Sequence, residues 1–240
     1  MIVLGHRGYS ARYVENTMIA FKKALELGAD GIELDLRGTK DGRVVVIHDE
    51  DLKRLCGVDV KVSDLTFEEL KEYKLNGETI PTFEEVLSIL DDKHILNAEI
   101  KEANVAERAL QLIDEFRLTD STVVSSFDHE LIARLIRKRP DMKFGFLVGE
   151  ELRNDPIGLI DKLLQHKPYS MHLPHQLFDY PMVFRKIVKM IRKAGAKIYV
   201  WTLDDLKKYQ RIEKHIDAVI TNQVELFVNA LKKPQRAEGA

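Results

Sequence analysis

Short apolar runs rich in β-branched residues alternate along the chain with segments whose apolar residues recur every three or four positions. The first pattern is typical of buried strands and the second of amphipathic helices. Strands are predicted at Ile2–Leu4, Gly31–Arg37, Ile95–Ile100, Thr122–Ser126, Lys143–Leu147, Tyr169–Leu173, Lys197–Trp201 and Ala218–Thr221. Helices are predicted at Asn16–Leu27, Phe83–Leu90, Ala103–Phe116, His129–Lys138, Ile157–Gln165, Pro181–Ala194, Leu206–Lys214 and Gln223–Leu231. Asn16 and Gly28 are expected to cap the first helix.

Strands that alternate with helices over the whole chain favour an α/β fold, a closed parallel (β/α)8 barrel of the TIM type. An open doubly wound sheet is the alternative. The Gly-x-Gly-x-x-Gly sequence of the dinucleotide-binding open sheet does not follow the first strand, so this alternative lacks its usual marker.

One interval departs from the alternation. Asp41-Gly42 stands between the second predicted strand and the β-rich run Arg43–His48. Asp-Gly between two such runs is a strong hairpin signal. A hairpin there returns His48 to the neighbourhood of Asp35.

The stretch after this hairpin, Asp49–Thr79, is too long for an ordinary connecting loop. We predict a small insertion with its own helix, Phe67–Tyr73, capped by Thr66. The rest of the chain is expected to form a single domain over residues 1–240, with a frayed polar tail at Pro234–Ala240.

Composition narrows the class of protein. Apolar residues make up 45% of the 240 positions and charged residues 32%, which suits a well-packed globular chain. Lys and Arg total 37 against 39 Asp and Glu, a net charge of −2, so no basic field indicates a nucleic-acid partner. The single cysteine, Cys56, excludes an intramolecular disulfide. No apolar run approaches the roughly 18 residues of a membrane span, and no signal peptide is recognisable. A cytoplasmic location without stable membrane insertion is therefore expected. The sequence leaves the oligomeric state open.

In a parallel barrel, functional groups lie at the carboxyl ends of the strands. His6 and Arg7 directly follow the first strand. An imidazole carries protons near neutral pH, and a guanidinium offers a planar set of donors for phosphate oxygens. Position alone favours the simpler interpretation, a loop histidine and a surface arginine.

Acidic residues end two other predicted strands. Strand alternation places Glu33 and Asp35 on one face, opposite apolar neighbours. In a barrel these carboxylates point into its mouth, where Glu99 can complete a three-carboxylate site. Such oxygen-rich sites suit one hard divalent cation, Mg²⁺ or Ca²⁺, with Mn²⁺ as a further option. The alternative is an edge strand with a solvated acidic face.

Basic residues flank these acids. Lys101 can balance their charge or hold an anion, and His48 supplies a second imidazole beside Asp49. His172 and His175 flank the sixth strand and fit either the barrel mouth or ordinary structural positions. A divalent cation with two basic side chains can neutralise a phosphate group, and two histidines can act as base and acid in a phosphoester displacement. No P-loop and no Gly-x-Ser-x-Gly motif is present, which argues against an NTPase and a serine hydrolase.

Several motifs together resemble the glycerophosphodiester phosphodiesterase family. They are Gly5-His6-Arg7-Gly8, Glu15-Asn16-Thr17, Gly28 to Asp35, Thr39-Lys40-Asp41-Gly42, Val46-Ile47-His48-Asp49 and Glu99-Ile100-Lys101. The resemblance implies a barrel with a small insertion after the second strand, and an enzyme of lipid and glycerol metabolism. Such an enzyme hydrolyses small-molecule glycerophosphodiesters to sn-glycerol 3-phosphate and an alcohol with a divalent metal, by way of a cyclic phosphate.

The resemblance also implies roles for individual residues. Metal ligation falls to Glu33, Asp35 and Glu99, acid–base catalysis to His6 and His48, phosphate binding to Arg7 and Lys101, and the glycerol side of the pocket to Phe127 and Trp201. The two aromatic residues fit packing in the barrel core equally well.

The chain departs from the family pattern at two places. Val14 stands where proline is common, which affects loop stiffness. Asn222 follows Thr221 where the family commonly has aspartate, so no catalytic role is predicted for this uncharged side chain. Two alternative functions are open: a lysophospholipase D-like phosphodiesterase and a non-catalytic barrel that binds a phosphorylated ligand.

Overall fold

The computed structural model describes residues 1–232, which form a closed barrel of parallel strands. The barrel strands are β1 (Ile2–His6), β2 (Gly31–Gly38), β6 (Ile95–Ile100), β7 (Thr122–Ser126), β8 (Lys143–Leu147), β9 (Ser170–Pro174), β10 (Lys197–Trp201) and β11 (Ala218–Thr221). Each strand pairs with its neighbour in parallel, and β1 closes the ring by pairing with both β11 and β2. The predicted (β/α)8 barrel is therefore confirmed, and the open sheet is excluded.

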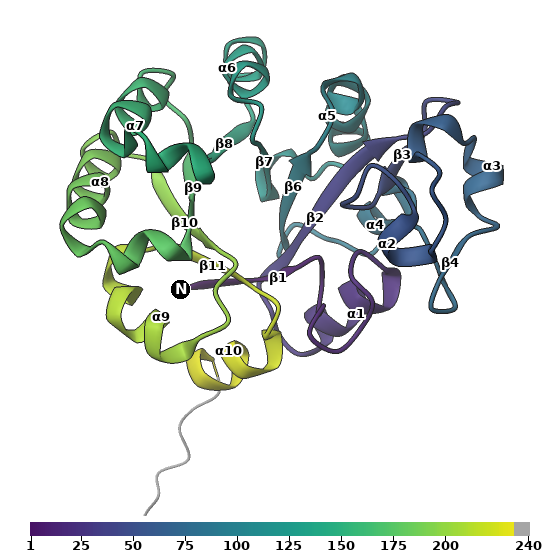
Figure 1. The fold of residues 1–240 in the computed structure, drawn as a ribbon, viewed down its shortest axis with the longest axis horizontal. Helices are drawn as coiled ribbons and strands as arrows, with labels where there is room; N and C mark the ends of the chain where they lie inside the picture. The colour runs from purple at the N-terminus through teal and green to yellow at the C-terminus, as the bar shows by residue number, and fades with distance from the viewer. Residues whose placement is uncertain (233–240) are drawn as a thin grey trace, which may run out of the picture.

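Helices surround the strands as an outer ring (Figure 1). They are α1 (Met18–Glu26), α4 (Phe83–Leu87), α5 (Ala106–Glu115), α6 (His129–Lys138), α7 (Pro156–Leu164), α8 (Pro181–Lys193), α9 (Leu206–Ile212) and α10 (Val224–Leu231). Most predicted boundaries lie within three residues of the observed ones. Within residues 1–232, no helix is long and apolar enough to cross a membrane.

The strands separate two apolar cores. Ile32, Leu34 and Leu36 point outward from β2 into the layer beneath the helices, whereas Leu4 and Tyr199 belong to a smaller cluster of the barrel strands. Because side chains alternate along a strand, Glu33 and Asp35 point to the opposite side, the barrel interior. This alternation positions the polar side chains of β2.

The start of α1 differs from the prediction. Thr17, with an extended backbone, caps the helix and accepts a hydrogen bond from the Ala20 amide, so the prediction of Asn16 as the cap was wrong. Asn16 has a left-handed backbone (φ +56°), and its side-chain amide donates to Asp35 instead. Gly28, with φ +96°, follows the end of the helix as predicted.

The predicted hairpin is present. Strand β3 (Val44–Val46) pairs antiparallel with the end of β2, with Leu36 opposite Val46. The amide of Ile47 donates to the Asp35 carbonyl at 3.0 Å, so the chain returns to the level of Asp35 just before His48.

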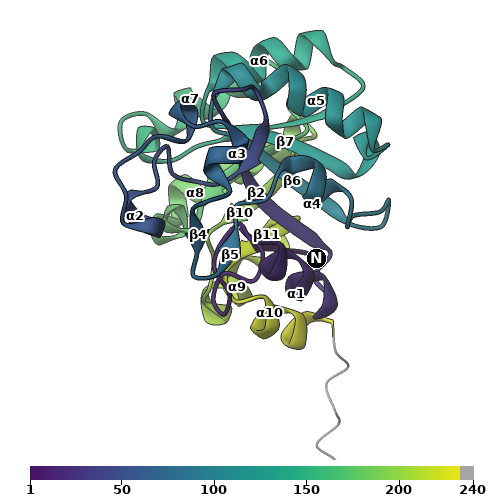
Figure 2. The ribbon, with the colours of Figure 1, turned by 90° about the vertical axis from the view of Figure 1, so that its right-hand side faces the viewer.

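The stretch after β3 packs beside β2 and β3 (Figures 1 and 2). It contains α2 (Lys53–Cys56), a 3₁₀ turn at Val62–Asp64, α3 (Phe67–Leu70), β4 (Lys74–Leu75) and β5 (Glu78–Thr79). Thr66 and Glu69 form a capping box for α3, which ends three residues before the predicted Tyr73. The stretch has its own apolar cluster around Leu52, Val62, Leu70 and Leu75. The domain boundaries stay a prediction, and Pro234–Ala240 lies outside the described residues.

Candidate active site

Three carboxylates converge at the carboxyl ends of adjacent strands. Glu33 and Asp35 point inward from β2, and Glu99 lies on β6 in register with Asp35. One oxygen from each of the three lies within 4.8 Å of the others, and all three side chains are buried. The structure thus brings the three predicted metal-binding residues together.

This cluster is electrostatically strained without a counterion. Burial and the charges of Asp35 and Glu99 raise the pKa of Glu33 well above its usual value. Burial and the charge of Asp35 raise the pKa of Glu99 to about 7. Burial also opposes ionisation of Asp35, but Arg7 and Lys101 outweigh it, so the pKa of Asp35 is lowered. A dication would relieve this repulsion.

The oxygens fit a hard divalent cation. Within residues 1–232, Asp35 Oδ1 is buried and accepts no hydrogen bond, although Lys101 Nζ lies 3.6 Å away. A buried oxygen without a donor is costly, and three clustered carboxylates supply the ligands that Mg²⁺, Ca²⁺ and Mn²⁺ prefer. The donor set excludes a soft, thiolate-type site, because all three ligands are oxygens.

His6 stands over this cluster from the end of β1. Its Nδ1 donates to Asn222 Oδ1 at 2.7 Å, and its Nε2 lies 3.9 Å from Glu33 Oε2. The orientation of the Asn222 amide is set by Asp204, which accepts from Asn222 Nδ2 at 2.7 Å. His6 therefore carries its proton on Nδ1 and presents the Nε2 lone pair towards the acids. Burial and Arg7 lower the pKa of His6, which favours this neutral form.

The imidazole of His48, like that of His6, is oriented by an acceptor for its Nδ1. Its Nδ1 donates to Asp49 Oδ1 at 2.7 Å. These neighbours can meet because β3 ends at Val46 and the chain is no longer extended at His48. Burial would raise the pKa of Asp49, but hydrogen bonds from Arg54 and His48 lower it to about 2. Asp49 is thus a firmly ionised partner for the imidazole, whose own pKa is lowered by burial.

Arg7 is positioned by a sharp turn after β1. Its backbone amide donates to Glu33 at 3.0 Å, its Nη1 donates to Glu15 at 2.8 Å, and its Nε lies 3.2 Å from Asp35 Oδ2. The next residue, Gly8, has φ +81°, and a Cβ there would lie 2.6 Å from the backbone of Ala20. Only glycine fits so close to α1 at this angle.

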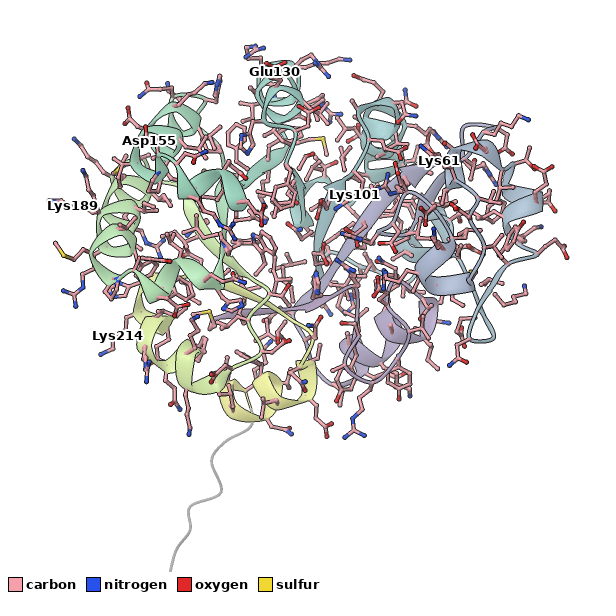
Figure 3. The ribbon with its side chains drawn as sticks, viewed as in Figure 1. Lys61, Lys101, Glu130, Asp155, Lys189 and Lys214 are labelled. Carbon is pink, nitrogen blue, oxygen red and sulfur yellow. The ribbon has the colours of Figure 1, made fainter. Side chains whose placement is uncertain are left out.

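Lys101 follows β6 and lies towards the middle of the ring in Figure 3, unlike Lys189 and Lys214 at its edge. Its Nζ donates to Glu99 Oε1 at 2.6 Å. It also lies 5.9 Å from the centre of the Phe127 ring. Arg7 and Lys101 therefore bring two cations to the acidic cluster from the ends of β1 and β6, the two parallel neighbours of β2.

Phe127 and Trp201 form an edge-to-face pair, with ring centres 5.5 Å apart. Phe127 is 41% exposed, and Trp201 is half-buried and donates from Nε1 to the His172 carbonyl. Both rings line a small cavity of about 60 Å³, together with His6, Arg7, Glu33, His48, Asn97, Glu99, Lys101, Leu147 and Ile220. All of the predicted site residues line this cavity except Asp35, whose Oδ2 lies 3.2 Å from Arg7 Nε.

The remaining candidate histidines lie elsewhere. His172 is fully buried, shares a hydrogen bond with Ser170 at 2.9 Å, and has its pKa lowered to about 3 by burial. His175 lies 3.2 Å from Lys208 Nζ. Among the described residues neither lines the small cavity, so both have structural positions.

Sequence reasoning missed the residues that hold the predicted ones. Asn222 accepts from His6, Asn16 donates to Asp35, and Glu15 receives both Arg7 and Arg54. Asn222 was assigned no role because it lacks a charge, yet a neutral amide oxygen suffices to accept the Nδ1 proton. No sequence pattern indicated Arg54, because its partner Glu15 lies 39 residues earlier in the chain.

Comparisons with known proteins all point to one family. Residues 6–226 match the model of the glycerophosphoryl diester phosphodiesterase family. A glycerophosphodiester phosphodiesterase of Caldanaerobacter subterraneus subsp. tengcongensis is 35% identical over 97% of this chain and 98% of its own. One from Bacillus altitudinis is 40% identical, over 92% of this chain and 94% of its own. The crystal structure of a glycerophosphodiester phosphodiesterase from Thermotoga maritima is 45% identical, with a TM-score of 0.86, and covers 96% of this chain and 98% of that one.

Proposed function

Because the chain belongs to the glycerophosphoryl diester phosphodiesterase family and is a glycerophosphodiester phosphodiesterase, we propose how its site performs that reaction. Substrate is cleaved to sn-glycerol 3-phosphate and an alcohol by two imidazoles that act beside one divalent cation. The observation that carries this proposal is the pair of histidines, each with Nδ1 occupied by an acceptor, beside three buried carboxylates.

Glu33, Asp35 and Glu99 would hold the cation. Their mutual repulsion and the unpaired oxygen of Asp35 support this assignment. When bound, Mg²⁺, Ca²⁺ or Mn²⁺ would supply Lewis-acid stabilisation of the phosphate oxygens.

Arg7 and Lys101 bind the phosphate. Both line the small cavity, and both are anchored by acids that fix their direction without covering all of their donors. Charge-assisted hydrogen bonds from these two groups stabilise the negative charge that grows on phosphorus-bound oxygens in the transition state. Phe127 and Trp201 form the apolar wall on the glycerol side of the same cavity.

The two histidines differ in a way that assigns their roles. His6 is buried, paired to a neutral amide and close to Arg7, which favours the neutral base. Burial lowers the pKa of His48 as well, but the hydrogen bond to the ionised Asp49 opposes that shift, so we assign His48 as the acid.

In the first step His6 Nε2 takes the proton of the substrate's glycerol 2-hydroxyl, whose oxygen attacks phosphorus. The bond from phosphorus to the alcohol oxygen breaks, and His48 protonates that oxygen. In the second step the roles reverse: His48 takes a proton from water, water opens the cyclic phosphate, and His6 returns its proton to the glycerol oxygen.

The assay is release of glycerol 3-phosphate from glycerophosphocholine, with EDTA or with Mg²⁺, Ca²⁺ or Mn²⁺ added. We expect activity to require a cation, and His6→Ala and His48→Ala each to lower kcat by about 10²- to 10⁴-fold. His94→Ala is the matched control, because His94 pairs with Asp91 outside the cavity. Activity unaffected by EDTA would remove the cation from the proposal, and full activity of His6→Ala would remove the acid–base pair.

The cyclic intermediate has its own test. A substrate analogue that lacks the glycerol 2-hydroxyl should bind but not react, and phosphorus NMR of the natural reaction should show a transient cyclic phosphate. Turnover of the analogue at the normal rate would mean that water attacks directly.

We further propose that residues 1–240 fold as one domain with Asp49–Thr79 as its insertion, and that the enzyme works in the cytoplasm on a small-molecule substrate. Limited proteolysis tests the first statement and should yield a single resistant core. Fractionation of the host cell tests the second and should find the enzyme in the cytoplasmic fraction. Composition and the pattern of elements support both.

A further inference from the structure

Charged residues are divided unevenly between two sides of the barrel. Residues 181–214, which form α8, β10, α9 and the turn that follows it, contain ten Lys and Arg against three Asp and Glu. Residues 49–79, which contain α2 and α3, have the opposite balance, with nine Asp and Glu against five Lys and Arg. The two stretches lie on opposite sides of the ring in Figure 1. The net charge of −2 therefore combines a basic side and an acidic side.

The outer face of α8 carries a row of cations. Lys186, Lys189 and Lys193 are exposed and recur at intervals of three and four residues, so they lie on one stripe of the helix. Met182, which is 87% exposed, begins the same stripe, and the exposed Arg185 flanks it. The buried residues are on the other face: Phe184, Ile187, Val188 and Ile191. No Asp or Glu in α8 balances this row.

The neighbouring helix extends this surface. Lys207, Arg211 and Lys214 are exposed and recur at the same intervals along α9 and the turn after it. Arg192 of α8 donates to the carbonyl of His215 in that turn at 3.0 Å, so the two helices lie side by side. Together they present two rows of cations on the outside of the ring.

Most of these cations have no partner within the protein. Of the ten, Arg192 and Lys197 pair with Asp217, and Lys208 pairs with Asp179. The other seven, which we call the basic face, form no ion pair with a residue that the structure describes: Arg185, Lys186, Lys189, Lys193, Lys207, Arg211 and Lys214. Such an array of like charges repels itself in the free protein and attracts a surface of opposite sign.

The composition of the basic face favours an anionic lipid surface as its partner. Met182 and Tyr180, which is 66% exposed, stand at the start of α8 beside the cations. Exposed apolar and tyrosine side chains next to Lys and Arg are typical of helices that bind the headgroup region of a membrane. Proteins that bind single-stranded nucleic acid instead place aromatic rings among their cations for base stacking. The exposed residues of α8 from Arg185 to Lys193 are all Lys or Arg, so the basic face lacks that arrangement along this helix.

We propose that the basic face binds anionic membrane surfaces reversibly, with Tyr180 and Met182 in contact with the lipid headgroups. The inference does not depend on the proposed catalytic mechanism. Tyr180 also lines a cavity that shares Trp201 with the catalytic one, so this contact brings the catalytic end of the barrel to the lipid surface. A glycerophosphodiester is a phospholipid without its acyl chains, so deacylation of membrane lipids would release the substrate there. The contact is screened by salt, and lysis at higher ionic strength therefore releases the enzyme into the soluble fraction.

Cosedimentation with lipid vesicles tests the proposal. At low ionic strength the enzyme should bind vesicles of phosphatidylcholine with phosphatidylglycerol but not vesicles of phosphatidylcholine alone. Salt at about 1 M, where the Debye length is about 3 Å, should release it. Binding to neither kind of vesicle, or equal binding to both, would overturn the proposal.

Two other partners are outcomes of the same experiment. Tighter binding to double-stranded DNA than to the anionic vesicles, at equal ionic strength, would overturn the proposal in favour of a nucleic acid. Self-association at low ionic strength, measured by sedimentation without vesicles, would instead assign the basic face to the acidic side of a second copy.

Charge variants locate the contact. Lys186→Gln combined with Lys189→Gln removes two charges from the basic face. The matched control combines Lys53→Gln with Lys61→Gln, at exposed lysines of the acidic side, and Lys61 lies across the ring from Lys189 in Figure 3. Each charge lost from the basic face should weaken partition into anionic vesicles by about fivefold, whereas the control should bind like the wild type. Neither pair lines the catalytic cavity, so both variants should keep the wild-type kcat on glycerophosphocholine. Unchanged vesicle binding by the α8 variant would overturn the assignment.

The apolar part of the contact has a variant of its own. Met182→Ser keeps all seven cations and removes an exposed apolar side chain. It should weaken binding to anionic vesicles without changing how steeply that binding falls with salt, whereas the lysine variant should make the salt dependence shallower. Binding by Met182→Ser as tight as that of the wild type would overturn the proposed headgroup contact.

Discussion

Replacing Glu99 by glutamine should change how the stability of the metal-free enzyme depends on pH. The pKa of Glu99 is raised from 4.5 to about 7 in the folded protein, by burial first and by Asp35 second. The folded state therefore binds this proton more tightly than the unfolded chain. The associated stability is fully present below pH 4.5 and is lost as pH rises through about 7. At about 1.36 kcal/mol per pKa unit, ionised Glu99 costs the fold about 3 kcal/mol.

Other buried groups act in the opposite direction, so the wild-type profile alone does not isolate Glu99. Burial lowers the pKa of His172 from 6.5 to about 3, and stability from this group rises with pH across that interval. The quantity to measure is therefore the difference in free energy of unfolding between Glu99→Gln and the wild type. This difference should grow in favour of the variant by about 3 kcal/mol as pH rises from below 4.5 to above 7.

Urea unfolding at a series of pH values, in EDTA, measures this difference. Glu107→Gln is the control, because Glu107 is an exposed residue of α5 that pairs with Lys138, and its profile should parallel the wild type. Saturating Mn²⁺ should stabilise the wild type more than Glu99→Gln, because binding to the folded state alone adds stability. A difference between Glu99→Gln and wild type that stays constant with pH would refute the reasoning.

Three further predictions concern the groups that hold the catalytic residues. Asn222→Leu should lower kcat by about 10- to 100-fold without changing metal affinity, because His6 loses the acceptor for its Nδ1 proton. Asn222→Asp keeps an acceptor and should stay active, so equal kcat values for the two variants would contradict this account. Arg54→Met should lower kcat by about tenfold. It should lower the free energy of unfolding in urea by no more than about 1 kcal/mol, since the ion pairs of Arg54 are half-exposed. Lys53→Met, at the neighbouring residue, is the control. Gly8→Ala should lower the free energy of unfolding by about 3 kcal/mol, because the positive φ disfavours any side chain and a Cβ would clash with α1. An unchanged melting temperature would contradict this account.

The barrel was predictable because its strands are short β-branched runs that alternate with helices of clear periodicity. The acidic cluster followed, because parallel strands end at the same side and alternate residues share a face, as Glu33 and Asp35 do. Both inferences need only local patterns and the closure of the sheet.

Other features depend on tertiary contacts between segments that are far apart in the sequence. Asn16 has the residue type of a helix cap, but tertiary contact with Asp35 competes for its side chain, and Thr17 caps instead. The hairpin of β4 and β5 was not predicted, because each strand is only two residues long, too short for a recognisable alternation. A cavity of about 690 Å³ is lined by the segments that follow β8 and β9 and by Trp201 of β10, so no single segment of the sequence predicts it.

The acceptor that holds His6 comes from the end of β11, next to β1, where the ring of strands is closed. The three acids, by contrast, all lie within the first hundred residues of the chain. During synthesis the anionic half of the centre can form well before Asn222 has left the ribosome. Full activity is therefore expected only after β11 has paired with β1 and Asn222 has met His6.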